Sequence, residues 1–427
     1  MSVISEEVSR NWLHGSILPF AEPAWARGCP SPYYGDSHRR LREAMRSWVE
    51  KNLSPNIQGW EKTASIPDWI YEQAAKDGLL MPIAAGPSIP PEWKGKYPII
   101  GDVSAEEWDG FHDLIVHDEI GRTGGIGLEN GLFGGTVWVG KAATDVDSFN
   151  DKSVVHEVLS GKARIALAVT EPDAGSDVRG LQTEAVLSSD GSRLIINGQK
   201  KEDSGDFTLI VIPRTKGVST RHMEISGSTT AGTAFVEFDD VEVPLDMVVG
   251  ERGKGFKYIV SNFNHERLFI AMQSVRCARV CLEDSIGYAL SRETFGKKLT
   301  EHPVIRLKFA NMSRETEALQ SWVESLIYQL GHLSKKEGEF LLAGTTAQVK
   351  AHSGIVLEHV VREAIQIMGG VGLTRGAGRG ERVERIWRDV KAITVPGGSE
   401  EIMLDLATRR ALAVTAELRK SRKDGKL

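Results

Sequence analysis

The stretch "LAVTEPDAGSD", residues 167–177, stands where the character of the chain changes, and it has the composition of a ligand-binding turn. Thr170 and Ser176 offer hydroxyl groups, and Gly175 lets a ligand approach the backbone closely. Successive backbone N–H groups in such a turn can hold an anion or a ring carbonyl. A plain surface turn would have a similar composition. The sequence on either side is therefore needed to distinguish a ligand-binding turn from a plain surface turn.

Outward from this turn, short β-rich runs alternate with turn clusters as far as about residue 250. The runs are "RIALAV", "TEAVL", "RLIIN", "FTLIVIP" and "GTAFVEF". They have no helical segment between them, which is typical of an antiparallel sheet or a small barrel.

On both sides of this β-rich zone the helical period dominates. The C-terminal side has long helical segments, at 256–292, 303–332, 337–368 and 399–418. Long helices joined by short loops indicate a bundle. The sequence therefore predicts an α+β, mostly α, fold. Its parts are an N-terminal helical domain at 36–161, a central small β-barrel at 162–252, and a C-terminal four-helix bundle at 253–420.

Composition narrows the class of partner. The chain has 427 residues, of which 41% are hydrophobic and 26% charged, and its net charge is −6. This weakly acidic balance argues against nucleic acid or an anionic membrane as a partner. Its three cysteines (Cys29, Cys277 and Cys281) have no His or Cys cluster around them in the sequence, so we expect no metal site. We expect a cytoplasmic protein, or a peroxisomal one because "GKL" at 425–427 half resembles that address.

Further motifs follow in the C-terminal half. In "SRETFGKKL", residues 291–299, Arg292 could clamp a phosphate and Phe295 could cover a ring. In "IQIMGGVG", residues 365–372, a helix stops at a double glycine. "WRDVKAITVPGGSEEIM", residues 387–403, leads into a last helix whose N-terminus favours anions. Taken singly, a solvated helix end or a glycine C-cap explains each of them.

Taken together and in this order, these motifs resemble those of the acyl-CoA dehydrogenase family, over residues 36–412. The resemblance implies FAD bound between the β domain and the C-terminal bundle, usually in a homotetramer. It implies an acyl-CoA or another acyl thioester as substrate, and an electron acceptor that the sequence does not identify. A base would take the α proton of the thioester while a hydride leaves the β carbon for flavin N5.

The resemblance also implies which residues contact the cofactor. Residues 167–176 would lie against the isoalloxazine, with Thr170 near its pyrimidine edge and Ser176 between flavin and thioester. Arg292 would reach the FAD pyrophosphate across a subunit interface. The full set of expected FAD contacts is Leu167, Val169, Thr170, Gly175, Ser176, Arg292, Thr294, Phe295, Gln366, Gly369, Gly370 and Ser399.

The expected base is Glu266 in "NFNHERLFIAM", residues 262–272. Many members of the family carry the base in a Glu-Gly-Thr run before the last helix, but the matching position here is Gly397. Other branches place it in a Glu-Arg-Leu run on the long helix, which "HERL" matches. Aromatic neighbours should raise the pKa of this carboxyl towards the range of a general base. The alternative is a structural ion pair. We also expect Ser176, Asn264 and Arg267 to contact the substrate.

One family segment is missing. After "NGQK", residues 197–200, the family continues with a Trp-Ile-Thr run whose aromatic ring covers the flavin and whose hydroxyl bonds N5. Here only residues 201–206 separate "NGQK" from the next β-rich run. Flavin could still bind through its other contacts. Alternatively, the protein is a flavin-free, redox-silent binder of an acyl thioester, acting as a non-redox enzyme or an assembly partner, or the gap reflects how the gene was read.

Overall fold

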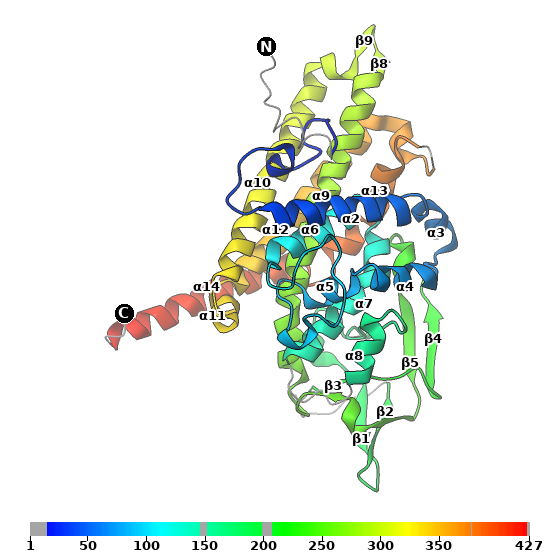
Figure 1. Ribbon diagram of the computed structural model, residues 1–427, viewed down its shortest axis with the longest axis vertical. Coiled ribbons are helices and arrows are strands. Elements are labelled where there is room, and N and C mark those ends of the chain that lie inside the picture. The colour runs from blue at the N-terminus through cyan, green and yellow to red at the C-terminus, as the bar shows by residue number, and fades with distance from the viewer. Residues whose placement is uncertain (1–14, 146–151, 199–206, 377, 425–427) are drawn as a thin grey trace.

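The computed structural model describes residues 15–145, 152–198, 207–376 and 378–424. Within them the fold is α+β and mostly helical, as predicted. Strands β1 to β5 gather at one end, and long helices run from there to the opposite end (Figure 1). A single large apolar core joins helices from both halves of the chain, and a smaller one lies within the sheet.

The N-terminal helices form because their apolar positions recur at helical spacing. In α2, Leu41, Met45 and Trp48 are buried as expected. The structure places the N-cap of α2 at Gly35, whose N–H donates to Nδ1 of His38 at 3.0 Å. The helices of this half are α2 (Asp36–Asn52), α3 (Ile57–Thr63), α4 (Asp68–Lys76), α5 (Leu80–Ala85), α6 (Gly110–Gly121), α7 (Ile126–Asp145) and α8 (Lys152–Leu159).

The β-rich zone forms several small antiparallel sheets. The largest has the order β1-β2-β6, in which Ile196 pairs with Val241 and both are buried. The other sheets pair β3 with β7 and β4 with β5. The bounds are β1 (Glu184–Leu187), β2 (Arg193–Asn197), β3 (Leu209–Ile210), β4 (Val218–His222), β5 (Ala234–Phe238), β6 (Val241–Pro244) and β7 (Val248–Val249). Among the described strands these sheets do not close into one barrel.

One predicted strand is absent. The run "RIALAV", residues 164–169, has no regular strand, and Leu167 is 37% exposed. Its backbone groups have no neighbouring strand to pair with in the described part of the chain, so β-propensity alone does not produce a ladder. The family segment that we found missing falls at residues 199–206, which lie outside the described residues.

The C-terminal half is built on α9 (Gly255–Ser291), which packs against α6, α10, α12 and α13. Its far end carries the short hairpin of β8 (Glu293–Thr294) and β9 (Lys297–Lys298). Two details differ from the prediction: the segment expected at 337–368 is broken at Leu342, and α13 was not foreseen. The remaining helices are α10 (Pro303–Gly331), α11 (Lys335–Leu341), α12 (Ala343–Met368), η7 (Gly369–Leu373), α13 (Glu381–Thr394) and α14 (Glu400–Lys423).

The segment before α2 is anchored in the interior by Glu22, which is 1% exposed. Its carboxylate lies 3.2 Å from Arg42, 3.0 Å from Arg46, 2.9 Å from Arg122 and 3.3 Å from Arg276. Burial opposes its charge, but the four arginines outweigh burial and hold the pKa of Glu22 well below its usual range. This segment is therefore part of the core.

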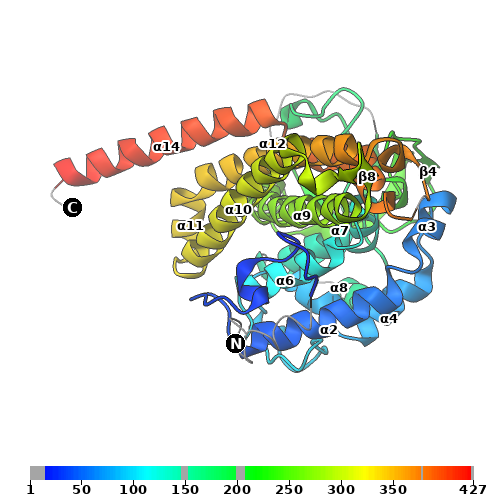
Figure 2. The ribbon, with the colours of Figure 1, turned by 90° about the horizontal axis from the view of Figure 1, so that it is seen from above.

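The last helix, α14, leaves the body of the molecule. Figure 2 shows it extending alone, with only its first turns against α12. Met403 and Ala407 are buried there against Ala347 and Ala351, whereas Leu418 further along is 47% exposed. The apolar face of α14 thus continues beyond the part of the helix that packs against α12.

None of the described helices combines the length and the apolarity that crossing a bilayer requires. The C-terminal tripeptide at 425–427, from which we raised a peroxisomal address, lies outside the described residues.

Candidate active site

Glu266 lies in the first half of α9, on a helical face shared with buried Ile270. Its carboxylate oxygen Oε2 is buried and has no hydrogen-bond partner among the described residues. Burial raises the pKa of Glu266 to about 7, against the opposing attraction of Arg267 and Lys350. A carboxyl group with this pKa near neutral pH is suited to accept a proton.

Arg267, next in sequence to Glu266, makes its hydrogen bonds to other groups. Its Nε donates to the carbonyl of Gly397 at 3.0 Å and its Nη1 to Oδ1 of Asn264 at 3.3 Å. Its guanidinium also lies over the ring of Phe263, 5.6 Å from the centroid. In the described part of the chain no cation lies within ion-pair distance of the Glu266 carboxylate.

Gly397 sits directly against α9. A Cβ at this position would lie 2.9 Å from Cδ1 of Ile270, one helical turn beyond Glu266, and its φ of +71° favours glycine. The two positions that the resemblance implies for the base, Glu266 and Gly397, therefore meet at the same part of α9. Ser399 follows this turn as the N-cap of α14.

Lys350 is a site residue that the sequence reasoning missed. It is 1% exposed, and its Nζ donates to the carbonyls of Thr394 at 2.6 Å and Gly398 at 2.5 Å. Burial, together with the charge of Arg267, lowers the pKa of Lys350 to about 8. The available signal was a lysine among buried positions of the helical segment "TTAQVKAHSG".

The turn at 167–177 is open to solvent. Thr170, Gly175 and Ser176 are exposed, and no atom lies within 4 Å of the position that a Cβ would take on Gly175. The turn is held from within, since the Glu171 carboxylate accepts the N–H groups of Gln182 at 2.5 Å and Thr183 at 2.9 Å. Leu167 and Val169 lie at its start, and Leu167 is exposed as well.

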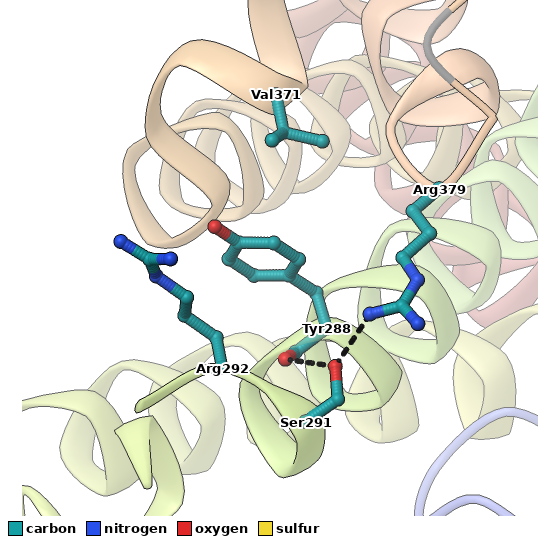
Figure 3. A pocket seen from close by; sticks show the side chains of 5 residues that line it. All are labelled: Tyr288, Ser291, Arg292, Val371 and Arg379. Atoms are coloured by element: carbon teal, nitrogen blue, oxygen red, sulfur yellow. Dashed lines mark hydrogen bonds between the residues drawn. The ribbon is translucent and has the colours of Figure 1, made fainter. Parts of the chain in front are cut away.

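Another group of expected cofactor contacts surrounds the far end of α9. Arg292 lines a pocket of ≈ 470 Å³ together with Tyr288, Ser291, Val371 and Arg379 (Figure 3). Phe295, at the tip of the β8–β9 hairpin, is 97% exposed with φ +52°. Thr294 lies beside it, with Oγ1 3.3 Å from Nε2 of His302.

Val371 of η7, which follows α12, lines the same pocket. Gln366, Gly369 and Gly370 are exposed where α12 passes into η7, and no atom lies within 4 Å of a Cβ built on either glycine. The structure thus brings Arg292 close to η7, as the motifs suggested. It separates them from Glu266, because Arg292, the C-cap of α9, lies 26 positions further along the chain, or roughly 39 Å at 1.5 Å per residue.

One cluster of metal-ligating side chains lies elsewhere, formed by His38, Asp109 and His112. Asp109 is the N-cap of α6, and its Oδ1 accepts the N–H groups of Phe111 and His112. The same oxygen lies 3.0 Å from Nε2 of His38 and 2.9 Å from Nδ1 of His112. These contacts give the cluster a role in capping the helix.

Comparison with known proteins gives matches over most of the chain. Residues 35–139 match the family described as "Acyl-CoA dehydrogenase, N-terminal domain", and residues 253–412 match "Acyl-CoA dehydrogenase, C-terminal domain". The chain is 38% identical to acyl-CoA dehydrogenase apdG of Emericella nidulans, over 92% of this chain and 95% of that protein. It is 37% identical to acyl-CoA dehydrogenase AFT10-1 of Alternaria alternata, over 93% and 96%.

The chain belongs to the acyl-CoA dehydrogenase family. It is accordingly an oxidoreductase that acts on CH–CH groups, and its cofactor is FAD. Its fold is that of the family: an acyl-CoA dehydrogenase of Bacillus anthracis complexed with FAD superposes with a TM-score of 0.70 at 22% identity, over 93% of this chain and 69% of that one.

The described residues fit FAD in three respects. The glycines that we expect to contact FAD, Gly175, Gly369 and Gly370, face open space. The Arg292 guanidinium has no carboxylate partner in the described chain. The buried Oε2 of Glu266 has no donor among the described residues, so this oxygen is not engaged by the part of the chain that the structure describes.

Proposed function

We propose that this acyl-CoA dehydrogenase desaturates the Cα–Cβ bond of an acyl thioester, with Glu266 as the base that removes the α proton. The observation that carries the proposal is a carboxylate whose buried Oε2 has no hydrogen-bond partner among the described residues and whose pKa is raised to about 7. At neutral pH a large fraction of this group is ionised, yet it binds a proton readily. FAD, when bound, accepts the hydride that leaves the β carbon.

The residues around Glu266 orient it and the substrate. Arg267 is tied to Gly397 and Asn264, so it fixes the turn before α14 against α9. Lys350 holds the same turn from α12 through the carbonyls of Thr394 and Gly398. We propose that Asn264, Arg267 and Ser176 contact the thioester.

We propose the FAD contacts in two groups that belong to different copies of the chain. The turn at 167–176 and Ser399 would hold the flavin end. Arg292 would hold the pyrophosphate of the neighbouring copy's cofactor, because it lies roughly 39 Å along α9 from Glu266, farther than one dinucleotide reaches. The remaining contacts of this second group are Thr294, Phe295, Gln366, Gly369 and Gly370.

Because Arg292 would hold the cofactor of a neighbouring copy, we also propose the homotetramer of the family. The uncovered face of α14 supports this assembly. We also propose the division into domains at 36–161, 162–252 and 253–420, with the small sheets of the middle part forming one small barrel. A cytoplasmic or peroxisomal location stays a proposal from the sequence.

The test is Glu266→Gln, which removes the base and keeps the shape of the side chain. We expect FAD to stay bound while its reduction by an acyl-CoA slows by about a hundred- to ten-thousand-fold, the usual size of general-base catalysis. Glu400→Gln and Glu401→Gln are the controls, since both carboxylates are exposed in the first turn of α14.

Two results would contradict the proposal. If Glu266→Gln unfolds the protein but leaves the activity of the folded fraction intact, Glu266 is structural and the base is Glu400 or Glu401. If the purified wild-type protein is colourless and takes up no added FAD, it is the flavin-free thioester binder.

A further inference from the structure

The pocket at the far end of α9 holds a second arginine, Arg379, on the loop between η7 and α13. Its Nη1 donates to Oγ of Ser291 at 2.8 Å, and that hydroxyl donates to the carbonyl of Tyr288 at 3.0 Å. Figure 3 shows this chain of hydrogen bonds, with Arg292 on the other side of the Tyr288 ring. A loop residue is thereby fixed to the helix that carries Arg292.

The charges of these two arginines are uncompensated. Neither guanidinium has a carboxylate partner in the described part of the chain. Other arginines of the same bundle are paired: Arg276 with Asp118, Arg279 with Glu317, and Arg382 with Asp284. Like charges in one pocket repel each other unless an anion lies between them. The pocket therefore has the charge and the open volume of an anion site.

We infer that Arg379 is a second cation of the cofactor site, and that Arg292 and Arg379 together hold a diphosphate group. The inference rests on the function proposed above, in which this end of α9 meets the pyrophosphate of the neighbouring copy's FAD. A diphosphate diester carries one negative charge on each phosphate, which matches one guanidinium each. Ser291 is a positioning residue, because it acts only through Arg379.

The experiment uses the full-length protein stripped of flavin and ADP as the probe, because ADP carries a diphosphate without the flavin ring. We expect wild type to bind ADP in isothermal titration calorimetry, and Arg379→Gln to raise the dissociation constant about tenfold or more. Ser291→Ala should raise it less, since the arginine stays and only its anchor is lost. Added salt should weaken the binding of ADP to wild type more than its binding to Arg379→Gln.

Arg375→Gln is the matched control, because Arg375 lies on the same loop, is exposed, and faces Glu384 at 3.4 Å. It should bind ADP as wild type does. The inference is overturned if Arg379→Gln binds ADP like wild type, if Arg375→Gln weakens binding equally, or if wild type binds no ADP. The Glu266→Gln variant should bind ADP normally, so an error about the base and an error about this pocket give different results.

Discussion

Glu266 shows how the surroundings of one carboxyl group fix its chemistry. The same side chain on the surface would be ionised at neutral pH and only weakly basic. In α9 its burial opposes the charge and moves the pKa to about 7, while Arg267 is engaged by Gly397 and Asn264. Arg267 and Lys350, the two cations nearest to Glu266, are therefore hydrogen-bonded to other groups and do not neutralise its carboxylate.

The raised pKa has a consequence for stability that can be measured. The unfolded chain releases this proton near pH 4.5 and the folded protein near pH 7, so the folded state binds more protons between these values. Stability from this group is thus lost as pH rises through that window. We expect the melting temperature of Glu266→Gln, relative to that of wild type, to rise from pH 4.5 to 7. Above pH 7 the difference between the two should stay constant. A difference independent of pH would contradict this assignment.

Gly397 offers a second test at the scale of a residue. Introducing Gly397→Glu into the Glu266→Gln variant should restore part of the flavin reduction, because the new carboxylate would start from the turn that packs against α9 one helical turn beyond Glu266. The change should also lower stability, by roughly 1–2 kcal/mol for the left-handed backbone, plus the contact with Ile270. Gly397→Ala in the same background is the control, and it should show the instability without the activity. Equal activity in both would mean that the carboxylate is irrelevant.

At the scale of an element, α14 carries an apolar stripe that extends beyond the part of the helix that packs on α12. Met403 and Ala407 pack on α12, and Ala411, Val414 and Leu418 continue the same face at helical spacing. The chain leaves that continuation uncovered. Another copy of the chain would bury it in the proposed tetramer.

Leu418→Asp tests this use of α14. A charge on the stripe should shift the protein towards smaller assemblies in sedimentation velocity, with helical content unchanged. Ala416→Asp is the control, since position 416 lies about 200° around the helix from position 418 and is exposed. An identical response of both variants would remove α14 from the interface.

Elements with strong local signals were predictable from the sequence, and elements that depend on distant partners were not. The long helices α9 and α10 follow their apolar period almost to the residue. The strand expected at 164–169 did not form, because a strand requires a neighbour that the run itself does not specify. The buried spacing of Val383, Ile386 and Val390 would have shown α13, but the glycine-rich loop before it concealed its start.

The same limit applied to the site. The raised pKa of Glu266 was predictable because its apolar flanks lie within its own helix, whereas its role as the base stays a proposal. Lys350 and Arg379 were missed because each acquires its role from elements far away in sequence, the 394–398 turn and the end of α9.

At the scale of the whole molecule, Glu22 joins elements that are remote in sequence. Its arginine partners Arg42, Arg122 and Arg276 come from α2, the end of α6 and α9. The match to the family's N-terminal domain begins only at residue 35, yet the carboxylate of Glu22, which precedes this match, is in the core.

Glu22→Ala should therefore destabilise the whole fold. It removes one carboxylate from a buried network, after which the four guanidinium groups keep Glu119 and Asp118 as carboxylate partners. Removing one partner of a buried ion-pair network costs about 3–5 kcal/mol. Denaturant unfolding would measure the loss. Glu50→Ala is the control, because Glu50 is an exposed partner of Arg122 at 3.9 Å and should contribute at most about 1 kcal/mol. Similar losses for both variants would contradict a central role for Glu22.

The distance along α9 between Glu266 and Arg292 also has a genetic consequence. If each cofactor takes its base from one chain and its arginine from another, two defective alleles can complement each other. Coexpressing a Glu266→Gln chain with an Arg292→Gln chain would create mixed assemblies in which some sites inherit both intact residues and others inherit both lesions. Activity should then reappear in a heterozygote although either homozygote lacks it, and cofactor sites confined to single chains would never show this rescue.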